Sequence, residues 1–184
     1  MTGKEAQMRK KKEILLEILD WSRFVFTALV LGVLISNKLI ANAQVPTGSM
    51  ENTIMPESRI IINRLAYINE KPERGDIISF YFPDDGKTNF LKRVIGLPGE
   101  TVLGKDGYVY IDGTILEEIY LKEPMEGEFG PFTVPEDSYF VMGDNRNNSW
   151  DSRYWTDPFV EKKEIVGRAE FEYFPELKRL RQKE

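Results

Sequence analysis

The chain contains 184 residues, of which 41% are hydrophobic and 30% are charged, which is enough for one domain with a sizeable core but thin for two. It contains neither histidine nor cysteine, which excludes a Ser-His-Asp triad, an imidazole or thiolate metal site, a thiol nucleophile and a disulfide. The formal net charge of −5 argues against a general nucleic-acid-binding protein, which needs a basic surface. Any catalysis must therefore use Ser, Thr, Lys, Tyr or carboxylate side chains.

The N-terminal part predicts a single transmembrane helix over residues 21–41. Residues 4–20 carry apolar side chains at helical spacing, and residues 24–35 form an uncharged apolar run. With Arg23 and Lys38 close to its ends, the segment 21–41 would be roughly 31 Å long, which is enough to cross a bilayer.

The charges that flank this segment predict its orientation. No Lys or Arg lies between Ala41 and Ser58, whereas basic residues precede the segment. Because basic flanks stay in the cytoplasm, residues 1–20 are expected to be cytoplasmic and residues 42–184 to form one domain outside the membrane. The preceding basic residues are Lys4, Arg9, Lys10, Lys11 and Lys12.

Two other interpretations of the N-terminal part remain open. A basic start, an apolar run and Ala41-Asn42-Ala43 are also typical of a cleavable signal peptide. A buried helix of a soluble protein would account for the short uncharged run, although not for the positive flank.

From Arg59 onward, short β-type runs alternate with turn residues, which predicts a β-rich domain. Asp106-Gly107 and Asp112-Gly113 are hairpin-turn dipeptides, so residues 101–116 are expected to form a β-meander. The other helical prospect is residues 176–183. The β-type runs are RIIINRLAY, DIISFYF, NFLKRVIGL, TVLGKDGYVYIDGTIL, SYFVMG and IVGRAEFEYF.

Lys92 is the best candidate for a catalytic base. Without histidine, a serine hydroxyl needs a neutral lysine amine to accept its proton, and burial on an apolar strand face favours the neutral amine. Read as a strand, the segment places Phe90, Lys92 and Val94 on one face and Leu91, Arg93 and Ile95 on the other. The alternative is a Lys-Arg pair that protects an edge strand from aggregation.

Two further segments carry candidate site residues. In PTGSMENTI, Pro46 and Gly48 would present Ser49 on a sharp turn, although such a step is often an ordinary loop. The run MGDNRNNSWDSRYW, residues 142–155, is densely polar, which requires either solvent or a closed network of pairs such as Asp151 with Arg153. It is interpreted either as a structured site loop or as a solvated loop.

Taken together, these segments resemble the type I (leader) signal peptidases, membrane-anchored Ser-Lys endopeptidases that remove signal peptides from exported proteins. The resemblance implies a mostly β fold, with an antiparallel β-sheet catalytic domain of the signal peptidase and LexA type behind one transmembrane helix. The short stretch between Gly104 and Ser138 is similar to the compact Gram-positive form with one anchor. The similar stretches are PTGSMENTI, RIIINRLAY, RGDIISFYFP, FLKRVIGLPGE and YFVMGDNRNNSWDSRYW.

By this resemblance, Ser49 is the nucleophile and Lys92 is the general base. The oxyanion hole would consist of the main-chain N–H of Ser49 and the hydroxyl of Thr47. Ser149 matches the serine that hydrogen-bonds the lysine amine, and would orient Lys92. The structural ion pairs that hold the site loop would be Asp144 with Arg93 and Asp151 with Arg153.

The resemblance implies that the substrates are signal peptides of exported preproteins with small residues one and three positions before the cut, bound as an added extended strand. It implies membrane lipid as a second partner. The net charge argues against nucleic acid as a partner, and nothing in the sequence suggests a metal or a cofactor. The enzyme would be a single-pass cell-membrane protein with an extracytoplasmic catalytic domain; the oligomeric state is not predicted. The pocket walls would be Val45, Pro46, Met50, Ile54, Phe90 and Leu91.

The sequence departs from the family at two positions. Asn147 replaces a usual Asp, which removes one charge from the loop, and Ala43 replaces a larger apolar residue, which would widen or shift the pocket for the third position before the cut. Ala41-Asn42-Ala43 also resembles the enzyme's own substrate motif, which suggests self-cleavage after Ala43.

Two rival functions remain. A LexA-type autoprotease shares the Ser-Lys dyad on a related fold but is soluble and cuts itself; the membrane segment and the GDNR-type loop argue against it. A catalytically inactive or partner-dependent paralogue would act as a membrane-anchored binding protein; the presence of both Ser49 and Lys92 argues against that.

Overall fold

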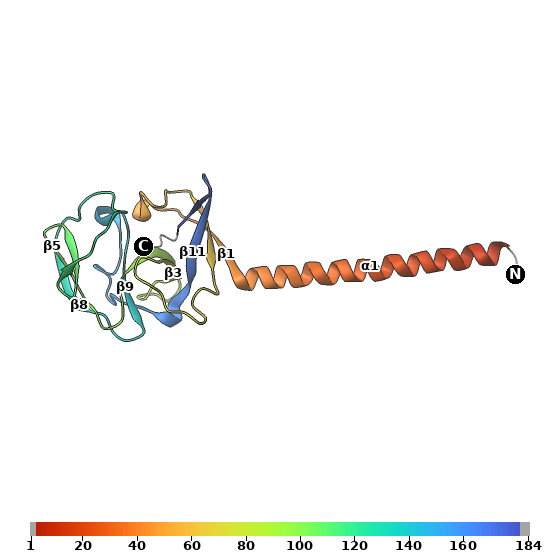
Figure 1. The fold of residues 1–184 in the computed structure, drawn as a ribbon, viewed down its shortest axis with the longest axis horizontal. Coiled ribbons are helices and arrows are strands. Elements are labelled where there is room, and N and C mark those ends of the chain that lie inside the picture. Colours follow the sequence, from red (N-terminus) through yellow and green to blue (C-terminus); the bar gives the residue numbers. More distant parts are fainter. Residues whose placement is uncertain (1–2, 181–184) are drawn as a thin grey trace. The chain divides into compact units, whose positions relative to one another are not determined.

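A computed structural model describes residues 3–180, except for the side chains of residues 3–6, 8–10 and 34–37 in the N-terminal helix. Figure 1 shows that helix and a β-rich domain. The chain separates into two compact units between Leu39 and Ile40. Each unit is therefore considered by itself.

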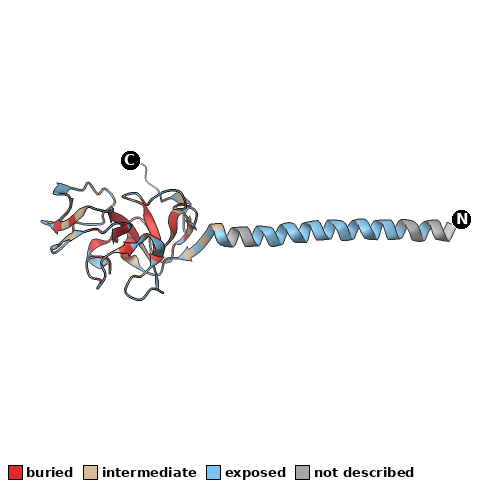
Figure 2. Ribbon diagram, turned by 90° about the horizontal axis from the view of Figure 1, so that it is seen from below, coloured by how far each residue is buried: buried red, intermediate tan, exposed pale blue. Residues whose placement is uncertain are grey.

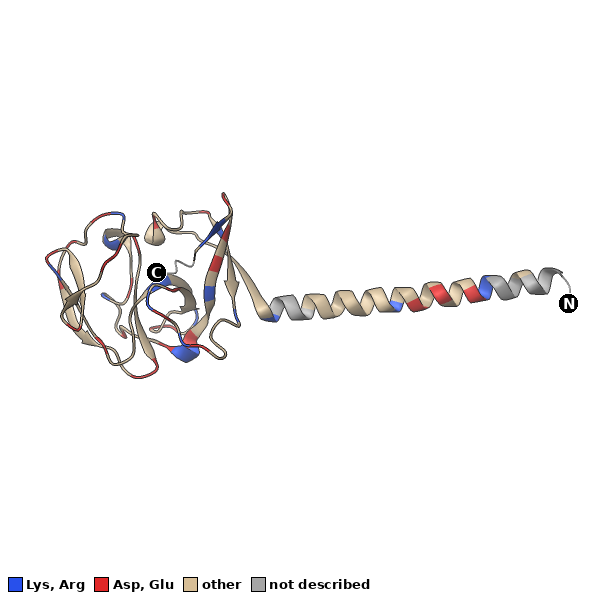
Figure 3. Cartoon of the chain, viewed as in Figure 1, with Lys and Arg blue, Asp and Glu red and all other residues tan. Residues whose placement is uncertain are grey.

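The N-terminal unit is helix α1, Gly3–Leu39. Its described side chains from Lys11 to Val33 are exposed (Figure 2). Apart from Lys38 in the last turn, its charged residues lie before the apolar run that begins at Phe24 (Figure 3). Within the described part of the chain, no helix combines the length and the apolar character that a membrane crossing requires. The predicted helix end at Ala41 is wrong by two residues, because the chain from Ile40 onward already pairs as a strand.

The β domain contains two antiparallel sheets, so the predicted mostly antiparallel β fold is confirmed. The larger sheet has the order β1-β2-β11-β3-β4-β9-β10, with β12 paired to β11, and the smaller has the order β7-β6-β5-β8. The strands are β1 Ile40–Gln44, β2 Arg59–Asn63, β3 Ile77–Tyr81, β4 Asn89–Gly96, β5 Thr101–Lys105, β6 Tyr108–Ile111, β7 Thr114–Ile115, β8 Phe129–Thr133, β9 Ser138–Met142, β10 Val160–Glu161, β11 Ile165–Phe174 and β12 Lys178–Arg179.

Local turn chemistry explains the smaller sheet. Asp106-Gly107 and Asp112-Gly113 all have positive φ, between 49° and 83°, as two-residue hairpin turns require. The predicted meander of β5, β6 and β7 is therefore confirmed. Three short 3₁₀ helices complete the domain: η1 Gly48–Met50, η2 Arg146–Asn148 and η3 Lys162–Glu164.

The predicted helix over residues 176–183 is wrong where the structure describes it. Lys178–Arg179 forms strand β12 against β11, and the main-chain N–H of Leu180 donates to the carbonyl of Glu170 at 2.9 Å. Burial of the Leu180 side chain favours this pairing over a helix. Residues 181–183 lie outside the described residues.

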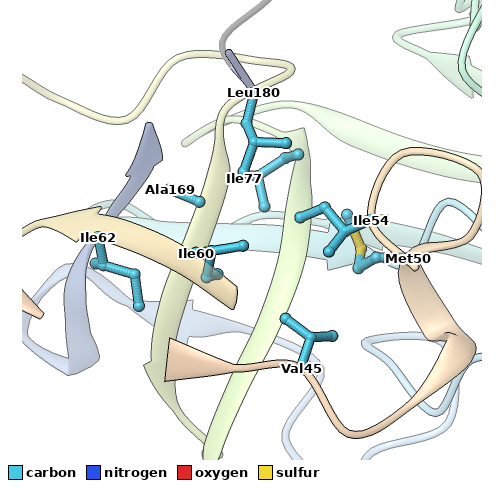
Figure 4. Packing of buried hydrophobic residues seen from close by; sticks show 8 residues of the cluster. All are labelled: Val45, Met50, Ile54, Ile60, Ile62, Ile77, Ala169 and Leu180. Atoms are coloured by element: carbon cyan, nitrogen blue, oxygen red, sulfur yellow. The ribbon is translucent and has the colours of Figure 1, made fainter. Parts of the chain in front are cut away.

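A hydrophobic cluster lies directly beneath the segment that carries Ser49 (Figure 4). Met50 and Ile54, which follow Ser49, are fully buried in it, and side chains from β2, β3, β11 and the C-terminal segment complete it. The packing of these side chains therefore holds the Ser49 segment against the sheet. The cluster consists of Val45, Met50, Ile54, Ile60, Ile62, Ile77, Ala169 and Leu180.

Two strand edges remain unpaired next to Ser49. β3 pairs with β4 from Asn89 to Arg93, whereas β9 pairs with β4 only from Arg93 to Gly96. Residues 89–92 therefore have, among the described residues, no strand partner on their second edge. β1 is a terminal strand of the same sheet, since it pairs only with β2 in that sheet.

Candidate active site

Ser49 lies in η1, in the turn that connects β1 to the buried Met50. Ser49 is buried, with 8% of its surface exposed. Its main-chain carbonyl accepts a hydrogen bond from the N–H of Asn145 at 3.1 Å, and the amide of Asn145 donates to the carbonyl of Gly48 at 3.0 Å. Anchored by apolar packing on one side and by Asn145 on the other, the serine hydroxyl is held in one place.

Lys92 extends from β4 to the same point. Its Nζ donates to Oγ of Ser49 at 2.7 Å, and it lies 5.5 Å from the centre of the Phe90 ring. The alternation read from the sequence is confirmed: Phe90 and Val94 pack in one hydrophobic cluster, whereas Leu91 packs in another. The structure therefore brings together the two residues expected to form the dyad, although they are 43 positions apart.

Burial makes the Lys92 amine a weaker base than an ordinary lysine. The residue is 5% exposed, and desolvation of the ammonium lowers its pKa from 10.5 to about 8. The carboxylates of Asp151 and Asp144 act in the opposite direction and keep the pKa from falling further. A substantial fraction of the amine is therefore neutral at mildly alkaline pH, as proton abstraction requires.

Thr47 is placed next to the dyad. Its Oγ1 lies 3.4 Å from Oγ of Ser49, and its backbone is extended with φ −122°. This short distance puts the hydroxyl within reach of a group bonded to Ser49. The arrangement is compatible with the predicted oxyanion hole of Thr47 and the main-chain N–H of Ser49.

Both predicted ion pairs are present and buried. Arg93 binds Asp144 with two nitrogen atoms, at 2.8 and 2.6 Å. Arg153 binds Asp151 in the same way, at 2.7 and 3.0 Å. Asp151 also accepts the main-chain N–H of Gly143 at 3.0 Å. The polar run over residues 142–155 is thus a structured loop held by buried ion pairs, with Asn147, Asn148, Trp150 and Tyr154 exposed on its surface.

The predicted hydrogen bond between Ser149 and Lys92 is absent from the structure. Oγ of Ser149 is buried and has no hydrogen-bond partner among the described residues. The hydroxyl packs over Gly143: a Cβ added at Gly143 would lie 2.3 Å from Oγ of Ser149 and 2.4 Å from the carbonyl oxygen of Ser49. Gly143 therefore allows the site loop to approach the nucleophile closely, a role that the sequence analysis missed.

Several supporting residues were also missed. Arg146 and Glu118 form a buried ion pair in which Arg146 Nη1 donates to Glu118 at 2.8 Å. The ring of Tyr120 lies 3.9 Å from the guanidinium carbon of Arg93. Thr53 donates to Asp144. The Arg146–Glu118 pair fastens the 116–125 segment to the site loop, Tyr120 packs that segment on β4, and Thr53 joins the Ser49 segment to the loop. No local sequence signal pairs residues so far apart.

A cleft of about 500 Å³ opens beside Ser49 and Lys92. Five predicted wall residues line it, but Ile54 does not, because it is fully buried in the cluster beneath Met50. Ala43, which was expected to affect the pocket for the third position, also lines the cleft. Lining residues that were not predicted include Ile60, Ile62, Ser79, Asn89 and Trp150. The predicted residues that line it are Val45, Pro46, Met50, Phe90 and Leu91.

The residue types around the cleft suit acyl transfer by a hydroxyl nucleophile. Oγ of Ser49, Nζ of Lys92 and Oγ1 of Thr47 converge at its edge, next to apolar side chains. Within the part of the chain that the structure describes, no group of three acidic, histidine or cysteine side chains could hold a metal ion.

Comparisons with known proteins identify the family. Residues 18–174 match the model of "Signal peptidase, peptidase S26". The chain is 40% identical over 162 residues to "Probable signal peptidase I-2" of Synechocystis sp., covering 85% of this chain and 73% of that protein. It is 38% identical over 187 residues to "Signal peptidase I P" of Bacillus subtilis subsp. natto, covering 96% and 97%.

Among solved structures, a crystal structure of a signal peptidase I from Enterococcus faecalis V583 is 40% identical, with a TM-score of 0.48, and the match covers 54% of this chain and 97% of that one. The family model spans most of the β domain together with the second half of α1. By the match to the family model and by the curated relatives, the chain belongs to the signal peptidases of peptidase family S26 and, within them, to the bacterial type I enzymes.

Proposed function

We propose that this chain is a membrane-anchored serine endopeptidase that removes signal peptides from exported preproteins by means of a dyad of Ser49 and Lys92. The observation that carries this proposal is the 2.7 Å contact between Nζ of Lys92 and Oγ of Ser49, both buried at the edge of an apolar cleft. The names of the relatives, which are signal peptidases, support the reaction class.

Acylation begins with the neutral amine of Lys92. It accepts the hydroxyl proton of Ser49 while Oγ attacks the carbonyl carbon of the scissile peptide bond. The resulting oxyanion is stabilised by the main-chain N–H of Ser49 and the hydroxyl of Thr47; loss of one such donor typically costs about 2.7–4 kcal/mol. The tetrahedral intermediate collapses when the Lys92 ammonium gives its proton to the leaving amine, which releases the mature protein.

Deacylation repeats these steps with water. Neutral Lys92 accepts a proton from a water molecule whose oxygen attacks the ester carbonyl. Collapse then breaks the ester bond, the proton returns to Oγ of Ser49, and the signal peptide leaves with a free carboxylate. The ion pairs of Arg93 and Arg153 hold the site loop during both halves of the reaction. Ser149 has no step here, because its hydroxyl makes no bond to the amine.

The free edge of β4 is suited to an extended substrate. Residues 89–92 leave main-chain groups unpaired beside Ser49, so a signal peptide can add as a further strand. Next to the dyad, the cleft is lined by Val45, Met50 and Leu91, which favour small apolar side chains one position before the cut. We propose that the position three residues before the cut also lies in this cleft.

The N-terminal segment is proposed as the anchor, with residues 21–39 of α1 in the lipid and the basic N-terminus in the cytoplasm. Exposed Trp21, Phe24 and Leu29 on α1 support this, because large apolar side chains on a helix need lipid or protein to cover them. The test is flotation with liposomes: the full chain should float, and a chain that starts at Ile40 should not. Equal flotation of both chains would contradict the anchor.

Cleavage of a preprotein whose signal ends in Ala-X-Ala, in detergent micelles, tests the function. The full chain should cut after the second alanine, whereas Ser49→Ala and Lys92→Met should not cut. Lys87→Met is the matched control, because Lys87 is exposed on the loop before β4 and should leave cleavage unchanged. A folded parent that cuts none of several preproteins would favour the inactive or partner-dependent alternative.

A further inference from the structure

We propose that Ser79 and Asn89 form a polar site in the cleft that recognises a hydroxyl-bearing side chain, threonine or serine, at the third substrate residue before the cut. This inference rests on the proposed function. It would make the pair a specificity determinant that discriminates between side chains of the same size.

The position of Ser79 in the cleft floor is the first observation. Ser79 on β3 lies directly opposite Leu91 on β4, so both side chains lie on one face of the sheet. Ile60 and Ile62 on β2 also line the cleft, and the floor is otherwise apolar. Ser79 is only 1% exposed. A hydroxyl buried among isoleucine and leucine side chains is unfavourable unless it has a partner.

The partner of Ser79 is Asn89, the first residue of β4. Oγ of Ser79 donates to Oδ1 of Asn89 at 2.5 Å, which fixes the direction of the amide group. Oγ of Ser79 keeps its lone pairs, and Nδ2 of Asn89 has no acceptor among the described residues. The buried Ser79 thus orients the exposed amide of Asn89, whose Nδ2 offers a donor that a hydroxyl group in the cleft can accept and an apolar side chain of the same shape cannot.

The spacing along β4 assigns the pair to one substrate position. Asn89 and Leu91 are two residues apart on the same face of β4, which corresponds to about 7 Å along a strand at about 3.3 Å per residue. A substrate strand beside β4, with its scissile carbonyl at Ser49, has the same rise per residue. When this strand runs parallel to β4 with its first residue before the cut level with Leu91, its third residue lies level with Asn89. The first residue lies level with the apolar walls at Met50 and Leu91.

Discrimination follows from the penalty for leaving a polar group unpaired. A valine at the third position has the shape of threonine but covers Ser79 and Asn89 without bonding them. One net hydrogen bond corresponds to about a two- to tenfold difference in kcat/KM. Ser79→Val should remove this preference, because it replaces the polar floor with an apolar one.

The test compares three preproteins that differ only in Ala, Thr or Val at the third position before the cut. In the full-length parent, kcat/KM for Thr should exceed that for Val. In Ser79→Val and in Asn89→Ala this ratio should fall two- to tenfold, while the Ala preprotein is still cut. Thr133→Val, on β8 of the other sheet, is the control that removes a hydroxyl away from the cleft and should leave the ratio unchanged.

The outcomes separate this inference from the proposed function. A parent that does not cut the Ala preprotein contradicts the proposed function. Cleavage of the Ala preprotein with the same Thr to Val ratio in the parent and both variants overturns only the role of Ser79 and Asn89. If Ser79→Val fails to fold, Asn89→Ala alone decides, because Asn89 is exposed at the start of its strand.

Discussion

Replacing Lys92 by methionine is expected to stabilise the folded domain at neutral pH while it abolishes cleavage. Methionine has nearly the same length as lysine and no charge, so it fills the site without desolvating an ammonium group. Burial lowers the pKa of Lys92 from 10.5 to about 8. At about 1.36 kcal/mol for each pH unit of difference, folding around this lysine costs about 3 kcal/mol at pH 7.

The pH dependence of this effect separates it from a simple change in packing. Between pH 8 and 10.5 the unfolded chain holds a proton on Lys92 that the folded chain has released, so the stability of the parent rises with pH in this window. Below about pH 8 both states are protonated and the destabilisation is complete. The variant lacks this group. Its advantage over the parent should therefore shrink by roughly 2–3 kcal/mol between pH 7 and pH 10.

Urea unfolding of the full chain in detergent micelles, followed by tryptophan fluorescence, measures the difference, since Trp155 is buried in the β domain. Lys87→Met controls for the loss of an exposed lysine and should change stability by less than about 0.5 kcal/mol. A difference between parent and Lys92→Met that stays constant from pH 7 to pH 10 would refute the assignment of Lys92 as a desolvated amine.

Further predictions concern the reaction and its supporting residues. The kcat/KM of the parent should rise about tenfold per pH unit up to about pH 8 and level off above it, because the neutral amine is the base; a flat pH profile would exclude this. Gly143→Ala should abolish cleavage, because the new Cβ would lie 2.4 Å from the carbonyl of Ser49; full activity of this variant would contradict the close approach. Asp144→Ala should destabilise the domain by about 3–5 kcal/mol, as it leaves Arg93 buried without its partner, whereas Asp144→Asn should cost less in the same denaturation assay. Self-cleavage after Ala43 should require a second molecule, because pairing of Ala43 in β1 with Ile60 in β2 keeps this bond from entering the active site of its own chain. A rate constant independent of protein concentration would contradict this.

The sequence predicted those features that depend on neighbouring residues. The two Asp-Gly turns were recognisable because positive φ at both central residues strongly favours these residue types. The orientation of Lys92 was predictable because strand alternation places it with Phe90 and opposite Leu91. The resemblance to the family added the pairing of Ser49 with Lys92, which local patterns alone did not establish.

The features that were missed or wrong depend on contacts between distant segments. The cleft floor arises because β11 inserts between β2 and β3, and neither Ile62 nor Ser79 carries a local signal of that placement. The prediction of a hydrogen bond between Ser149 and Lys92 was wrong, because the Ser149 hydroxyl packs over Gly143. Helix α1 ends at Leu39 because strand pairing with β2 begins at Ile40.

The position of the last strands has a consequence for when the enzyme can become active during its synthesis. β11 supplies the central pairing partner of both β2 and β3, and Leu180 completes the cluster under the Ser49 segment. Both follow Ser49 at a large distance along the chain, so the support for Ser49 does not exist until residues 165–180 have been synthesised. This topology delays assembly of the Ser49 site until β11 and Leu180 have been synthesised and have packed, so the segments made earlier cannot be cut by their own chain before that point.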